Sequence, residues 1–132
     1  MPFTCPICDK DPTSHSFKKV GRRNNVNYYY TCPAKATKYN DREGILNHYR
    51  GILEENNNEP WIWLFDSKGF ETKHALNVSL AIDLAKLIDK YSDSLQKIEI
   101  INATWHIRGT LKLVLPFLDE KTKKVIKIND NL

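Results

Sequence analysis

The sequence has no apolar stretch long enough to cross a membrane. A membrane-spanning helix needs about 20 largely apolar residues, whereas charged residues make up 27% of this 132-residue chain and interrupt its apolar runs. The first residues also lack the basic and apolar regions of a secretory signal peptide. We therefore expect a folded cytoplasmic or nuclear protein.

Glycine is scarce, and its placement excludes the common nucleotide-binding loops. None of the five glycines belongs to a Gly-rich turn of the kind that joins a strand to a helix in dinucleotide-binding or P-loop proteins. Paired carboxylates or a catalytic triad do not converge at any predicted strand end. The sequence therefore predicts a binding protein rather than an enzyme.

Cysteine is limited to three residues, an odd number that argues against a disulfide framework. In a reducing compartment, a pair such as Cys5 and Cys8 is more often a metal or redox element than a disulfide. A redox role is disfavoured because residues 12–14 read as loop, where thioredoxin-like proteins begin a helix. A nucleophilic role is disfavoured because no base accompanies the pair.

Residues 15–32 predict a β-hairpin that adds two metal ligands to this pair. With the turn centred near Arg23, strand pairing places His15 opposite Cys32. Thiolates combined with one imidazole suit a tetrahedral structural zinc site. The predicted zinc ligands are therefore Cys5, Cys8, His15 and Cys32. The alternative is that the cysteines are reduced and purely structural.

From Tyr28 onward, strand and helix patterns alternate. The run Trp61–Phe65 is apolar at every position, which is typical of a central strand covered on both faces. The alternation predicts an α/β fold, with a mostly parallel sheet of about four strands flanked by helices. His48, in the first long helix, is predicted to be solvated. The expected units are a Cys/His hairpin segment at 1–35 and an α/β lobe at 26–132, which the second hairpin strand joins.

Three stretches, in this order and spacing, carry a family resemblance. Trp61–Phe70 is an apolar strand that ends in Asp-x-x-Gly-Phe. Tyr91–Trp105 contains Ile-Asn-Ala near its end, and Leu115–Thr122 contains Pro-Phe-Leu-Asp. Together they resemble the CRAL-TRIO lipid-binding domain family, in the short form that lacks an amino-terminal helical lobe. Ser92–Ser94 stand where the family has Pro-Glu-Arg, and Val125 stands where phosphatidylinositol-binding members have lysine. These departures disfavour inositol-phosphate recognition.

The resemblance implies a non-enzymatic module that holds a lipid or other small hydrophobic ligand, docks a protein partner, or does both. The ligand would lie against one face of the sheet, beneath a helix that starts near Phe117. The candidate ligand-binding residues are Trp63, Phe65, Trp105, Leu111, Phe117 and Leu118.

Two other interpretations stay open at this stage. The first is a protein-interaction adaptor whose pocket has closed, because about 100 residues leave little material for both a core and a lipid-sized cavity. The second is nucleic-acid binding by the zinc hairpin, through the basic residues at 18–23 beside Tyr28 and Tyr30. It ranks third, after ligand binding and the adaptor, because the basic group is small and the remaining charges nearly balance. The basic groups at 18–23 and 121–127 would also suit peripheral contact with an anionic membrane.

Overall fold

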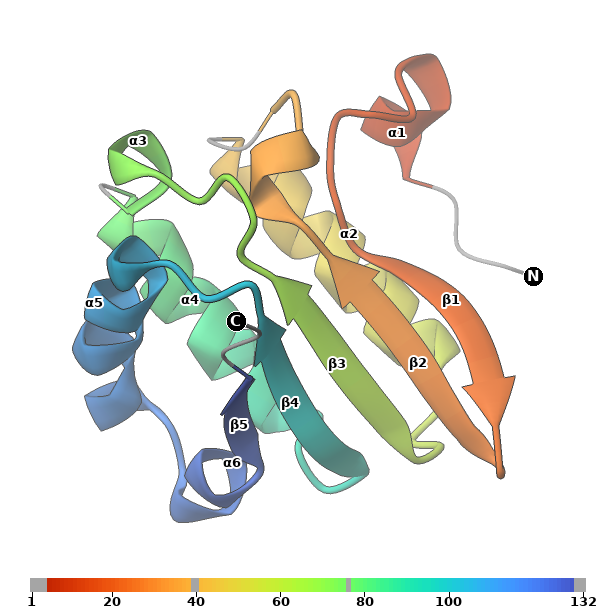
Figure 1. Ribbon diagram of the computed structural model, residues 1–132. Coiled ribbons are helices and arrows are strands. Elements are labelled where there is room, and N and C mark those ends of the chain that lie inside the picture. The colour runs from red at the N-terminus through yellow and green to blue at the C-terminus, as the bar shows by residue number, and fades with distance from the viewer. Residues whose placement is uncertain (1–4, 39–40, 76, 130–132) are drawn as a thin grey trace.

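A computed structural model describes residues 5–38, 41–75 and 77–129 (Figure 1). No helix in these ranges is long and apolar enough to span a bilayer. In chain order the elements are α1 (Pro6–Lys10), β1 (Lys18–Arg23), β2 (Val26–Thr31), η1 (Pro33–Lys35), α2 (Arg42–Glu55), β3 (Trp61–Asp66), α3 (Thr72–Ala75), α4 (Val78–Lys90), β4 (Leu95–Ile101), α5 (Trp105–Val114), η2 (Leu115–Phe117), α6 (Glu120–Lys124) and β5 (Ile126–Asn129).

The strands form one sheet in the order β1-β2-β3-β4-β5. The β1–β2 pair is antiparallel, and every other neighbouring pair is parallel. The predicted mostly parallel α/β sheet is confirmed, with five strands instead of about four. The strand that carries Trp61 and Trp63 lies in the middle, as predicted.

The long helices cover one face of this sheet. Strands β2 to β5 are neighbours in chain order, so right-handed crossovers carry every connecting helix to the same side. Figure 1 shows α2 and α4 behind the sheet, and α5 packs against α4. The expectation that β3 is covered on both faces is therefore wrong for the described helices. Trp61 and Trp63 are buried, whereas Ile62 and Leu64, on the opposite face, are only half-buried.

Aromatic side chains form the part of the core between α2 and the sheet. The Phe17 ring, which precedes β1, is 1% exposed and stacks on Tyr49 of α2 with ring centroids 4.2 Å apart. Tyr29 and Trp63 of the sheet also contact the Phe17 ring. Complete burial of such a side chain stabilises a fold by about 1.5–3 kcal/mol. Phe17 therefore anchors the amino-terminal segment to the rest of the molecule.

The hairpin differs in register from the prediction. Its turn is centred on Asn24 and Asn25, whose φ angles of 54° and 66° fit a type I′ turn, because asparagine tolerates the left-handed region. Lys18 pairs with Tyr30, and the register shifts between Lys19 and Gly21. Since β1 begins at Lys18, His15 lies before the strand and does not face Cys32.

Asp66 at the end of β3 holds three strand ends together. Its Oδ1 accepts hydrogen bonds from the Lys68 backbone N–H at 3.0 Å and from Asn102 Nδ2 at 3.0 Å, and its Oδ2 accepts from the Tyr30 hydroxyl at 2.6 Å. Burial acts to raise the pKa of Asp66, but these hydrogen bonds outweigh it and hold the pKa below the ordinary value. The turn continues through Gly69, whose φ of 80° favours glycine.

Candidate functional site

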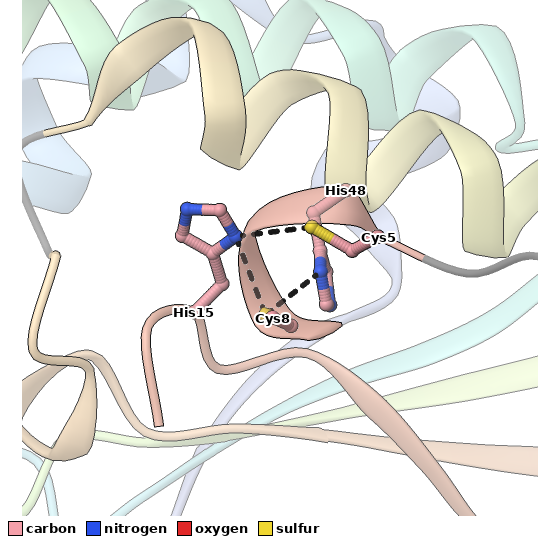
Figure 2. A group of neighbouring side chains, drawn as sticks. All are labelled: Cys5, Cys8, His15 and His48. Carbon is pink, nitrogen blue, oxygen red and sulfur yellow. Dashed lines mark hydrogen bonds between the residues drawn. The ribbon is translucent and has the colours of Figure 1, made fainter. Parts of the chain in front are cut away.

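Two histidines and two cysteines come together where the amino-terminal segment meets α2 (Figure 2). Cys5 precedes α1 and Cys8 lies within it, so one helical turn brings both thiols to the same side. His15 comes from the loop before β1, and His48 comes from the middle of α2. The potential ligand atoms of Cys5, Cys8, His15 and His48 all lie within 4.8 Å of one another. We call these four residues the Cys/His group.

Hydrogen bonds fix the tautomers of both histidines. His15 Nε2 lies 3.1 Å from a carboxylate oxygen of Asp41, and His48 Nε2 lies 2.7 Å from the Phe17 carbonyl oxygen. Since both partners only accept, each Nε2 carries the proton and donates it. In the neutral form of each ring, Nδ1 then presents a lone pair toward the sulfur atoms. This arrangement resembles the outer-shell hydrogen bonding that orients metal-binding histidines.

The distances inside the group fit a tetrahedral metal site. His15 Nδ1 lies 3.6 Å from Cys5 Sγ and 3.6 Å from Cys8 Sγ, and His48 Nδ1 lies 3.7 Å from Cys8 Sγ. A zinc ion about 2.3 Å from sulfur and about 2.0–2.1 Å from nitrogen separates those atoms by about 3.6 Å in a tetrahedron. The Cys/His group can therefore hold a metal ion.

Burial shifts the pKa of two side chains in the Cys/His group. It lowers the pKa of His48, which keeps the imidazole neutral, as a metal ligand must be. It raises the pKa of the Cys8 thiol, which favours the protonated form until a cation is present. A bound metal ion would supply the positive charge that stabilises the thiolate.

The predicted set of ligands and this group differ at one position. Cys32 is buried outside the group, and its thiol donates to the Lys68 carbonyl oxygen at 3.6 Å. His48 takes the fourth place, and the prediction that it is solvated is wrong, because its exposed fraction is 8%. A signal was present in the sequence: His48 lies three residues after Ile45 and four before Ile52, which puts it on the apolar stripe of α2.

An apolar cavity of about 180 Å³ lies between the covered face of the sheet and the helices. Side chains of β3, β4, α2, α4 and α5 contribute to its wall. None of its lining residues is Asp, Glu, Lys or Arg. The cavity therefore suits an apolar group such as an acyl chain. Its lining includes Trp63, Phe65, Ile100, Leu111, Val114 and Leu118.

The family is evident from comparison with known proteins. The family model described as the CRAL/TRIO domain matches residues 42–132, more than half of the chain. The chain belongs to the CRAL/TRIO domain family. This family consists of lipid-binding domains, and the resemblance predicted from three sequence stretches is confirmed. A search among curated proteins gives no match to the sequence.

Solved structures support the same fold. The crystal structure of Sfh5 superposes with a TM-score of 0.66 at 15% sequence identity, covering 86% of this chain and 46% of that one. At this identity the likeness concerns the fold alone. This chain spans about half the length of the Sfh5 structure.

Within this CRAL/TRIO domain, four of the six predicted ligand-binding residues line the cavity: Trp63, Phe65, Leu111 and Leu118. Trp105 and Phe117 do not, because their side chains are 76% and 44% exposed. Helices α4 and α5 both cover the cavity; α5 begins at Trp105, whereas the predicted start near Phe117 falls at the end of the short turn η2. The inward face of α5 contributes Ile107 and Val114 to the wall, in addition to Leu111.

Proposed function

We propose that this CRAL/TRIO domain binds a lipid or other small hydrophobic ligand in the cavity between its sheet and its helices. The proposal rests on the cavity itself, an apolar space that no side chain of the described residues fills. Burying an acyl chain there would contribute about 0.8 kcal/mol per methylene without any covalent chemistry. Trp63, Phe65, Leu111 and Leu118 would contact the guest.

The size of the cavity limits what can enter. Its volume of about 180 Å³ lies below the roughly 300–1,000 Å³ of pockets that enclose a drug-sized ligand. We therefore propose that the guest is one acyl chain or an apolar molecule of similar bulk. A lipid with two chains would need α5 to move outward.

A chain-length series of fatty acids tests this proposal. Each added methylene is expected to raise the affinity about fourfold, corresponding to about 0.8 kcal/mol, until the cavity is full. Calorimetric titration of delipidated protein with octanoate, decanoate, dodecanoate and tetradecanoate gives the trend. Native mass spectrometry of freshly purified protein would show whether a lipid copurifies. Affinity that does not depend on chain length would overturn the proposal.

Docking of a protein partner is a second candidate, favoured by exposed apolar side chains on the outer side of α5 and η2. Trp105, Leu113 and Phe117 follow one another at intervals of eight and four residues and are 76%, 53% and 44% exposed. Such a patch on a folded domain is typical of a surface that contacts another molecule. An anionic membrane is the competing partner, since Lys112 lies on the same helix. Loss of binding in Leu113→Ser, tested against anionic vesicles and against cell extract, separates the two partners.

We also propose that the Cys/His group holds a structural zinc ion. Thiolate and neutral imidazole are ligands that zinc prefers, and four protein ligands leave no open position for catalysis. Asp41 and the Phe17 carbonyl would orient the two imidazoles. Elemental analysis of protein purified without chelator is expected to find one zinc per chain, and His48→Ala is expected to remove it. Cys32→Ser, which changes a thiol outside the group, is expected to retain the metal.

A further inference from the structure

The Cys/His group and the ligand cavity share a wall. His15 belongs to the group and also lines the cavity. Its neighbour Ser16 lines the cavity as well. On α2, Ile45 and Tyr49 line the cavity on either side of His48 in the sequence. The same short loop and the same helix therefore serve both features.

Phe17 anchors the end of the amino-terminal segment, but among the described residues α1 has few attachments to the rest of the fold besides the Cys/His group and the Ile7 side chain, which lies near Gly44 of α2. Helix α1 has five residues, none of them buried, whereas isolated helices shorter than about 12 residues are marginal in water. The backbone hydrogen bonds that tie this segment to residues 37–38 lie beyond α1. Thr37 and Lys38 donate to the carbonyl oxygens of Thr13 and Ser14 at 2.9 Å. The two cysteines are therefore a main attachment of residues 5–12.

A metal ion would change the strength of this attachment. In the metal-free protein, the thiols of Cys5 and Cys8 can offer the histidines only weak S–H hydrogen bonds. With a metal bound, four coordinate bonds join the segment to α2, and structural zinc commonly supplies folding free energy in this way. Metal occupancy would thus change how firmly His15 is held against the cavity, in addition to its hydrogen bond with Asp41. Ser16 is held independently, because its hydroxyl accepts a hydrogen bond from the Cys32 backbone N–H at 2.8 Å.

We propose that metal binding at the Cys/His group controls how tightly the cavity retains its apolar ligand. The inference rests on both functions proposed above. Metal holds the part of the wall formed by His15, and loss of the metal loosens that part and lets ligand and water exchange. We expect metal removal to weaken ligand binding about tenfold, within the roughly 5- to 150-fold range of coupled sites. Linkage requires that the ligand strengthen metal binding by the same factor.

The test uses dodecanoate as ligand and zinc as metal, with the 132-residue chain. Calorimetry measures the dodecanoate Kd of zinc-loaded and chelator-treated protein, and a competition titration measures the zinc Kd with and without dodecanoate. His48→Ala removes one ligand from α2, and Cys32→Ser is the matched control outside the group. If His48→Ala does not fold, hydrogen exchange on the wild-type protein tests the coupling instead. Zinc removal is then expected to speed exchange in residues 5–17 and leave β4 unchanged.

The outcomes distinguish this coupling from the two functions on which it rests, ligand binding in the cavity and zinc binding at the Cys/His group. Equal, roughly tenfold changes in both Kd values support it, provided that Cys32→Ser behaves like the wild type. Zinc that binds without changing the dodecanoate Kd overturns the coupling and leaves both proposed functions standing. Failure to bind zinc rejects the metal site and the coupling but not the cavity. If neither form binds dodecanoate, the cavity proposal and the coupling fall together while the metal site stands.

Discussion

Filling the cavity should stabilise the protein and abolish ligand binding at the same time. Ala85 on α4 is buried and lines the cavity, so a larger side chain there extends into the space. Ala85→Leu adds three carbon atoms, and at about 0.8 kcal/mol per buried carbon the gain is at most about 2.4 kcal/mol. Imperfect fit reduces this figure. Alanine and leucine have similar helix propensities, so the backbone contributes little.

The assay is thermal unfolding with and without dodecanoate. For a 132-residue chain, 1 kcal/mol corresponds to about 3–4 °C in Tm, so Ala85→Leu should raise the Tm of the free protein by up to about 8 °C. Dodecanoate at 100 times its Kd should stabilise the wild type by about 2.7 kcal/mol and the variant not at all. Ser79→Leu, at an exposed position of the same helix, is the control. A variant that unfolds earlier, or that still responds to dodecanoate, would refute the reasoning.

Three further predictions concern single side chains. A Cβ on Gly44 would overlap the Asp41 carboxylate, so Gly44→Ala should disturb the contact between Asp41 and His15. Zinc binding, measured in a competition titration, should weaken about 10- to 100-fold. Thr110 lines the cavity, and its buried hydroxyl has no partner among the described residues, so Thr110→Val should raise stability in urea by about 1 kcal/mol; a loss of stability would contradict this. Asp66→Asn should cost about 1–3 kcal/mol at pH 7. Because the folded pKa of Asp66 is depressed, its contribution is present above the unfolded pKa and lost as pH falls through the folded pKa. In urea unfolding, the difference between the variant and the wild type should therefore begin to shrink as the pH falls below about 3.9 and disappear below the folded pKa.

Much of the fold follows from local sequence patterns. The apolar run Trp61–Phe65 and the alternating helices predict a parallel sheet with β3 at its centre, because both signals depend on neighbouring residues. Coverage of the sheet depends on strand order, which local patterns do not specify. Sequential order with right-handed crossovers puts every long helix on one side, so Ile62 and Leu64 are left half-buried on the other.

The metal ligands show which features local sequence patterns do not predict. The Cys5–Cys8 spacing indicates a metal site by itself, since one turn aligns both thiols. The fourth ligand depends on contacts between distant segments. The predicted hairpin register placed Cys32 opposite His15. It is off by two residues near the two-asparagine turn and by one residue at Lys18, because the pairing shifts after Lys19. His48 joins the group from 40 residues beyond Cys8, and only the apolar stripe of α2 pointed to its burial.

Methyl NMR of the delipidated protein tests the central claim most directly, namely that an apolar ligand enters the space between sheet and helices. Titration with dodecanoate is expected to shift the methyl signals of Ile100, Leu111 and Val114, which line the cavity, and to give ligand contacts to them. The exposed Leu113 and Ile128 should be unaffected. Shifts confined to these exposed residues, with the cavity methyls unchanged, would contradict the account.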